Sequence, residues 1–212
     1  MSTIQRLLSF FAMLLFAAGC FAAAYFARSS GNKAAGTSLM RLREALGVSE
    51  GSGLRNGRMF FVETVTSYTR LINSLLVTFT RTPHLRLRLK IAKGALPVAS
   101  FGPRVRGARA LAGFFRAFGL ARPRVLIGDT EFDRRFNLFV AIGGSEEAKK
   151  IFNAAARAAL LLAKKAGANG RYVFRENEIA YDAPGLPVGE PDVCAAIAVV
   201  EAMERLADGA ES

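Results

Sequence analysis

Residues 84–91 read HLRLRLKI, and apolar and polar side chains alternate strictly along them after His84. Successive side chains of a β-strand point to opposite faces of the sheet, so this pattern predicts a strand with one buried and one cationic face. The leucines and the isoleucine are expected to be buried. The basic residues are expected to form the other face, and they are the candidate binding residues: Arg86, Arg88 and Lys90.

Segments on both sides of this strand predict further strands and helices. Expected strands, rich in β-branched and aromatic residues, cover 59–66, 75–81, 124–127 and 136–142, with a hairpin of 171–174 and 178–181. Expected helices cover 107–119 and 145–165, and a last one begins at Pro191. This order favours an α+β fold, in which helices pack on one face of a mainly antiparallel sheet. We expect one such domain over residues 58–208.

The beginning of the chain is strongly apolar. Residues 7–27 read LLSFFAMLLFAAGCFAAAYFA, without a charge or a proline. A helix of this length, at about 1.5 Å per residue, spans the roughly 30 Å hydrocarbon core of a bilayer, so residues 1–28 are expected to form a single-pass transmembrane anchor. Residues 29–57, rich in Gly, Ser and Asn and with one short helical candidate near residues 38–46, are expected to be a flexible tether. Because more positive charge follows the apolar segment than precedes it, the C-terminal domain is expected in the cytoplasm.

Two alternatives for this apolar segment stay open. Residues 1–24 also resemble a secretory signal peptide with a small-residue cleavage site, and cleavage there would make the domain periplasmic or secreted. Residues 17–20, Ala-Ala-Gly-Cys, resemble a lipoprotein signal in which Cys20 is lipidated after cleavage, although such signals usually have Leu at the position of Ala17.

The net charge of +12 comes from one part of the chain. Between Glu63 and Asp129 there is no acidic residue, whereas twelve Lys and Arg residues fall there and the rest of the chain is balanced. Such a window favours an anionic lipid surface or an acidic protein as partner. Nucleic acid is less favoured, because the chain has no Trp and its aromatic residues do not interleave with the basic strand as base stacking requires.

The sequence contains no complete catalytic constellation. It has no Cys or His pair at the spacing of a zinc site, no Gly-x-Ser-x-Gly elbow and no Walker-type loop. His84, the only histidine, is expected to be a solvent-facing strand residue, and Cys194 a small core residue of the last helix. We therefore predict no cofactor and favour a protein that is not an enzyme.

One acidic cluster is a candidate metal site. Residues 128–136 read GDTEFDRRF, and in an extended segment Asp129, Glu131 and Asp133 would share a face on which three carboxylates could hold Mg²⁺ or Ca²⁺. The alternative, which we favour, is a polar turn whose phenylalanines fill the core and whose arginines offset the acidic charges.

The segment from Asp129 to Phe136, followed by Val140 and the helix that begins at Ser145, resembles a pattern in uncharacterised bacterial membrane proteins. In that family, an Asp-x-x-Phe-Glu/Asp-x-x-Phe motif leads into a strand, a helix and a terminal hairpin within a domain of unknown function. The resemblance covers roughly residues 124–182. It implies a bacterial, membrane-associated protein and carries over no catalytic residue.

These observations favour one function over two others. The favoured function is a membrane-anchored, non-enzymatic interaction module whose basic sheet face meets anionic lipid or an acidic partner. The alternatives are a periplasmic or secreted binding domain, which requires cleavage of residues 1–24, and a metal-dependent hydrolase built on the acidic cluster.

Overall fold

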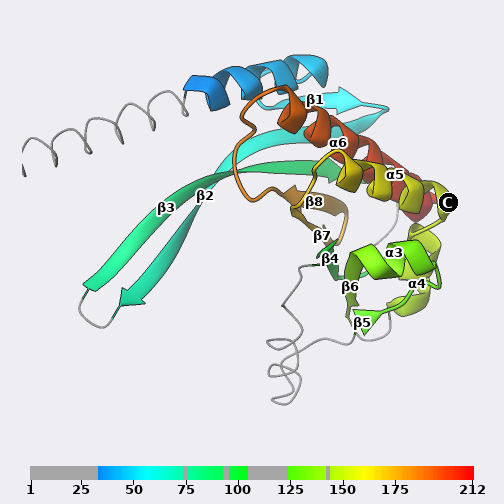
Figure 1. Ribbon diagram of the computed structural model, residues 1–212. Helices are drawn as coiled ribbons and strands as arrows, with labels where there is room; N and C mark the ends of the chain where they lie inside the picture. The colour runs from blue at the N-terminus through cyan, green and yellow to red at the C-terminus, as the bar shows by residue number, and fades with distance from the viewer. Residues whose placement is uncertain (1–32, 74–75, 93–95, 105–123, 142–143) are drawn as a thin grey trace, which may run out of the picture.

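The computed structural model describes residues 33–73, 76–92, 96–104, 124–141 and 144–212. The predicted membrane anchor over 1–28 and the predicted helix over 107–119 lie outside these residues. Within them, no helix combines the length and the apolar character needed to cross a membrane. The described chain has the predicted α+β architecture (Figure 1).

A single antiparallel sheet organises the described residues. Its strands are β1 (Ser52–Arg55), β2 (Arg58–Asn73), β3 (Leu76–Lys90), β4 (Ala99–Pro103), β5 (Arg124–Val125), β6 (Phe136–Val140), β7 (Arg171–Arg175) and β8 (Glu178–Asp182). The order across the sheet is β1-β2-β3-β8-β7-β4-β6-β5, and every neighbouring pair is antiparallel. Strand β3 joins the two halves of the sheet, because it pairs with β2 on one side and β8 on the other.

Strands β2 and β3 form a hairpin arm that extends away from the rest of the fold (Figure 1). The sequence predicts two strands where the structure has the single strand β3, because Pro83 interrupts the pattern. The N–H of Leu85, two residues further along, points away from β2 and donates to Gly185 O at 3.0 Å. Because backbone N–H groups two residues apart in a strand point to the same side, position 83 also faces away from β2. Only β2 pairs with this part of β3 among the described residues, so the missing N–H of Pro83 breaks no ladder hydrogen bond.

Helices cover one face of the sheet. They comprise residues 33–45, α3 (Thr130–Arg135), α4 (Ser145–Ile151), α5 (Ala154–Lys165) and α6 (Glu190–Glu211). The longest, α6, lies against β3 and β8, and α5 packs on α6 (Figure 1). The helix predicted over 145–165 is two helices, because Asn153 starts a new one: its Oδ1 accepts a hydrogen bond from Ala156 N at 2.9 Å.

The core lies between the sheet and these helices. Phe101 of β4 stacks on Tyr172 of β7 with ring centroids 4.6 Å apart, and Phe152 meets Phe101 edge-on at 4.9 Å. Complete burial of an aromatic or aliphatic side chain contributes roughly 2 kcal/mol to folding, so this cluster is a main source of stability. The alternation of residues 84–91 is confirmed, because its apolar members are buried: Leu85, Leu87, Leu89 and Ile91.

The described part of the predicted tether belongs to the fold, and the prediction of a flexible tether there is wrong. Residues 33–45 are helical, and Leu42 and Leu46 are buried in the core. Strand β1 then pairs with β2 through a turn at Asn56 and Gly57, whose φ angles are 50° and 76°. Positive φ at both central positions defines a type I′ hairpin, for which Asn-Gly is the preferred sequence. The dipeptide Asn56-Gly57 is therefore the sequence feature that predicts this hairpin.

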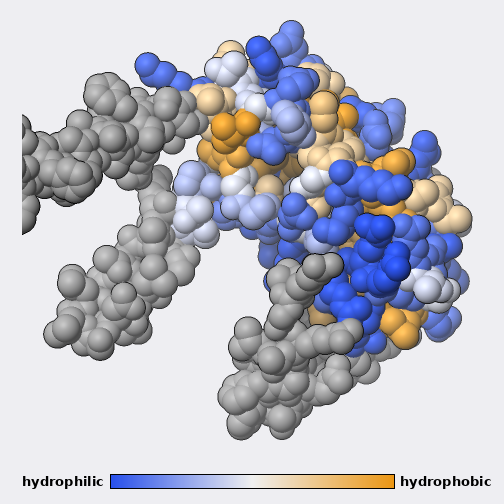
Figure 2. Space-filling view, in the orientation of Figure 1, coloured by the Kyte–Doolittle hydropathy of each residue, from blue (hydrophilic) through white to orange (hydrophobic). Residues whose placement is uncertain are grey.

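The described surface is predominantly hydrophilic in the view of Figure 2, with hydrophobic patches between the polar regions. Two of the exposed large apolar residues, Leu54 and Met59, lie opposite each other in the β1–β2 hairpin. The others come from separate parts of the described chain: Met40, Val98, Leu126, Leu162 and Val188. Single exposed apolar side chains are normal on globular proteins. Charged residues are therefore the better candidates for a functional site.

Candidate binding surface

The face of the sheet opposite the helices is the candidate binding surface, and we call it the open face. Its central part consists of the outward residues of three adjacent strands. On β3 these residues alternate with the buried leucines. Their cross-strand partners on β8, and the partners of those residues on β7, point to the same face of the sheet. The residues that define it are Arg86, Arg88, Lys90, Glu178, Ala180, Asp182, Arg171, Val173 and Arg175.

Two of the three predicted binding residues are ion-paired. Arg86 Nε lies 2.5 Å from Asp182 Oδ1. Arg88 bonds Glu63 of β2 through Nη2 and Glu178 of β8 through Nη1, the latter at 2.9 Å. Hydrogen bonds to Asp182 and to Glu63, respectively, are the main reason why the pKa values of Arg86 and Arg88 are raised above the ordinary value. The outward face of β3 carries the predicted cations, and carboxylates of the neighbouring strands β2 and β8 make this part of the open face a mixed-charge ladder.

Lys90, the third predicted residue, keeps its charge uncompensated. It is exposed, and its Nζ lies 5.6 Å from the ring centroid of Phe61. The guanidinium carbon of Arg88 lies 4.6 Å from the same ring centroid. Cation–π contacts of this kind hold the lysine stem over the sheet while leaving the ammonium in solvent. Within the described residues, no carboxylate lies within ion-pair distance of Lys90.

Two further exposed cations on the open face were missed from the sequence. Arg171 and Arg175 lie on β7, and no described carboxylate forms an ion pair with either of them. The signal was present, because residues 171–175 read RYVFR and Tyr172 and Phe174 are buried. The same alternation that places Arg86 on the open face places both arginines there.

The acidic cluster does not form the predicted face of three carboxylates, because residues 130–135 are helical and not extended. Asp129 is the N-cap of α3: its Oδ1 accepts hydrogen bonds from the backbone N–H of Glu131 and Phe132, each at 3.0 Å. Its Oδ2 pairs with Arg157 Nε at 2.9 Å. The hydrogen bond from Phe132 N, followed by the one from Arg157, lowers the pKa of Asp129.

The other two carboxylates of the cluster have separate partners. Asp133 accepts hydrogen bonds from Ile127 N at 3.1 Å and Gly128 N at 3.0 Å, and Glu131 pairs with Arg135 at 3.2 Å. In the described ranges no group of three or more His, Cys, Asp or Glu residues is placed to hold a metal ion. Of the favoured alternative, the burial of the two phenylalanines, Phe132 and Phe136, is confirmed, whereas the helix α3 takes the place of the polar turn.

The two residues considered for nucleophile or acid–base chemistry, His84 and Cys194, lie on different elements. His84 is partly exposed on β3, opposite Val65. Cys194 is exposed on α6, with its Sγ 4.0 Å from Glu190 Oε1, so the prediction of a core cysteine is wrong. The reason is helical phase, because α6 buries Val193 and Ala195 on either side of it.

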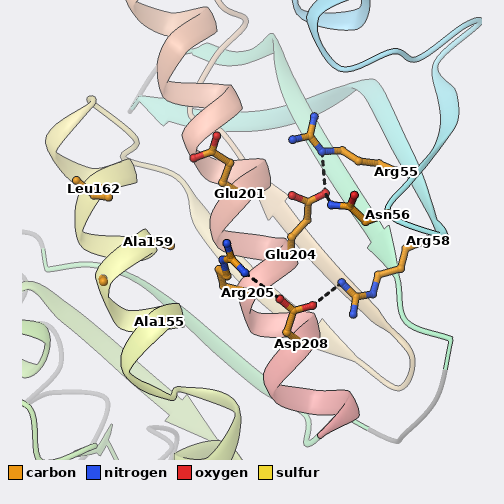
Figure 3. A pocket seen from close by; sticks show the side chains of 11 residues that line it. Arg55, Asn56, Arg58, Ala155, Ala159, Leu162, Glu201, Glu204, Arg205 and Asp208 are labelled. Atoms are coloured by element: carbon orange, nitrogen blue, oxygen red, sulfur yellow. Dashed lines mark hydrogen bonds and ion pairs between the residues drawn. The ribbon is translucent and has the colours of Figure 1, made fainter.

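A second polar region is the groove between α5, α6 and the β1–β2 turn, with a volume of about 750 Å³ (Figure 3). Glu204, only 9% exposed, accepts hydrogen bonds from Arg55 Nε at 2.7 Å and Asn56 Nδ2 at 2.9 Å. Arg58 pairs with Asp208 at 2.9 Å. Figure 3 shows these side chains reaching from the turn to α6. Because they bond one another, we assign the groove a structural role in holding the hairpin to the helix.

Comparison with known proteins gives no further guide to this surface. No protein-family description, no curated protein and no solved structure matches the chain. The bacterial, membrane-associated character implied by the resemblance over residues 124–182 stays a prediction. The fold of the described residues is that of an α+β domain with an eight-stranded antiparallel sheet.

Proposed function

We propose that this protein is a membrane-anchored, non-enzymatic interaction module whose open face meets anionic lipid. One observation carries the proposal: all three acidic residues next to Arg86 and Arg88 are used in ion pairs, whereas Lys90, Arg171 and Arg175 have no carboxylate partner among the described residues. A face with this balance attracts an anionic surface, at roughly 1 kcal/mol for each Lys or Arg close to the lipid.

The anchor part of the proposal comes from the sequence. Residues 7–27 are uncharged and long enough to cross a bilayer, and a domain held there samples the lipid surface at high effective concentration. The basic residues that follow the segment favour a cytoplasmic domain, where the leaflet is rich in anionic lipid. Protease treatment of spheroplasts carrying a C-terminally tagged chain tests this orientation: a protected tag supports it, and a digested tag contradicts it.

Lysine footprinting of the full chain tests the role of the open face. The chain is reconstituted in nanodiscs of phosphatidylcholine alone or with phosphatidylglycerol, and acetylation of single lysines is followed by mass spectrometry. Lys90 on the open face is compared with Lys165 at the end of α5, which is also exposed.

The expected result is that phosphatidylglycerol slows acetylation of Lys90 about fivefold, the equivalent of roughly 1 kcal/mol, and that salt reverses this effect. Lys165 should react equally in both nanodiscs, because α5 lies on the helical side of the sheet. Equal rates for Lys90 in the two lipids would refute lipid binding by the open face and leave an acidic protein as the partner to seek.

A further inference from the structure

A hollow of about 390 Å³ opens on the open face beside the mixed-charge ladder. Its floor consists of outward positions of β4, β6 and β7, and its rim includes the loop before β7 and the segment after β8. The residues that line it include Ser100, Gly102, Asn137, Gly170, Arg171 and Asp182. All of them are described residues, and the acidic cluster, the groove of Figure 3 and the predicted binding residues Arg86, Arg88 and Lys90 lie outside the hollow.

Two of the residues that line the hollow are glycines, and a side chain would meet different surroundings at each of them. At Gly170 a Cβ would lie 2.3 Å from Asp182 O and 2.5 Å from the Tyr181 ring, so packing excludes any side chain there. At Gly102 a Cβ would meet no atom closer than Gly170 O at 3.4 Å, which is ordinary contact. A side chain at position 102 would therefore lie in contact with Gly170 and Arg171, two other residues that line the hollow.

The polar groups around this space are mostly hydrogen-bond donors. Arg171 Nη2 donates to Ser100 Oγ at 2.9 Å, and Ser100 is only 8% exposed. No described residue accepts the hydroxyl proton of Ser100 or bonds the side-chain amide of Asn137. The one carboxylate in the lining, Asp182, is bound by Arg86 through both oxygens, at 2.5 and 3.2 Å. The hollow thus presents one guanidinium without a carboxylate partner among the described residues, and two side chains that can each donate a further hydrogen bond.

We infer that this hollow binds a phosphate group. A tetrahedral oxyanion has enough acceptor oxygens for the Arg171 guanidinium, the Ser100 hydroxyl and the Asn137 amide together, and hydrogen bonds from a guanidinium to phosphate are charge-assisted. The phosphate can come from a soluble phosphate ester or from the headgroup of an anionic phospholipid. The second source rests on the proposed function, because it needs the open face to lie on the membrane.

Calorimetric titration of the full chain in phosphatidylcholine nanodiscs with glycerol 1-phosphate tests the site. Gly102→Val fills the hollow, Arg171→Gln removes its charge, and Arg175→Gln removes an equal charge from the same strand outside the lining. Each of the first two variants should weaken binding about tenfold or more, as loss of a charge-assisted hydrogen bond does, while Arg175→Gln should stay within about twofold. Thermal unfolding of each variant confirms its fold, and Asn137→Ala replaces Gly102→Val if that chain does not fold.

Absence of heat with glycerol 1-phosphate overturns the inference, and so does an equal loss of binding in Arg171→Gln and Arg175→Gln, which indicates diffuse charge attraction only. The footprinting of Lys90 distinguishes the two proposals. If phosphatidylglycerol protects Lys90 but the chain does not bind glycerol 1-phosphate, the phosphate site is refuted and the proposed function stands. If the chain binds glycerol 1-phosphate but Lys90 is not protected, the proposed function is refuted and the phosphate site stands. If Gly102→Val also lowers the protection by phosphatidylglycerol, the phosphate source is the headgroup. If it lowers only the binding of glycerol 1-phosphate, the source is a soluble ester.

Discussion

Arg86 and Asp182 lie directly opposite each other on β3 and β8 and are joined by two hydrogen bonds, Nε to Oδ1 at 2.5 Å and Nη2 to Oδ2 at 3.2 Å. This paired geometry is the strong form of a guanidinium–carboxylate contact. Arg86 and Arg88, which lie in the acid-free stretch of sequence, thus receive their counter-charges from outside it, namely from Glu63 and from the two acidic residues of β8. The electrostatic character of the open face is therefore set by three carboxylates and not by the number of arginines.

Release of Arg88 from its carboxylates should strengthen association with anionic lipid. In the variant Glu63→Gln/Glu178→Gln, two negative charges leave the open face and the Arg88 guanidinium loses both partners. We expect phosphatidylglycerol to protect Lys90 at least about fivefold more than in the original chain, at a stability cost of about 1 kcal/mol. The matched control is Glu147→Gln/Glu201→Gln, which removes two exposed acidic charges from α4 and α6. If the control raises protection equally, net charge and not the open face determines the effect.

Loss of the Glu204 side chain should destabilise the fold far more than loss of the side chain of Glu201, an exposed residue on the same helix. Glu204→Ala leaves Arg55 and Asn56 without their shared acceptor at a mostly buried position. We expect a loss of about 2 kcal/mol in the free energy of unfolding, measured by urea denaturation. Glu201 is exposed and has no partner in the described chain, so Glu201→Ala should change stability by less than about 0.5 kcal/mol. Equal effects of the two changes would show that the contact does not hold the hairpin to α6.

Asp129 should make folding stability dependent on pH in the acidic range. Its pKa is lowered in the folded state, chiefly by the hydrogen bond from Phe132 N, so its stabilisation is complete above the ordinary carboxyl pKa of about 3.9. That stabilisation is lost as pH falls through the lowered folded-state value. Asp129→Asn keeps a capping side chain but loses the charge, and should cost about 1 kcal/mol near pH 6. The stability difference from the original chain should shrink below about pH 4, and a difference that stays constant down to about pH 2 contradicts the assignment.

Local pattern was a good guide to elements and a poor guide to charge partners. The alternation in residues 84–91 and the hairpin turning at residues 176–177 follow from period and turn residues alone, and the structure has both. The bond between Arg88 and Glu178 joins residues 90 positions apart, and only the strand order brings them together. Neither interpretation of the acidic cluster, an extended segment or a polar turn, includes the helix α3, although Asp129 has the preferred side chain for the position before a helix.

The hairpin arm should be dispensable for folding. Val65 and His84 lie opposite each other where the arm leaves the sheet, so a chain in which Asn-Gly replaces residues 66–83 can close the hairpin there with a type I′ turn. The buried leucines of β3 remain in place, and we expect the urea-unfolding free energy to fall by less than about 1 kcal/mol.

Leu87→Ala supplies the contrast to this excision, because loss of a fully buried leucine costs roughly 2–5 kcal/mol. A shortened chain that loses as much as this variant would show that the arm packs on the core in solution. A shortened chain that keeps its stability would mean that the arm contributes little to the fold, as expected where β2 and β3 pair, among the described residues, only with each other.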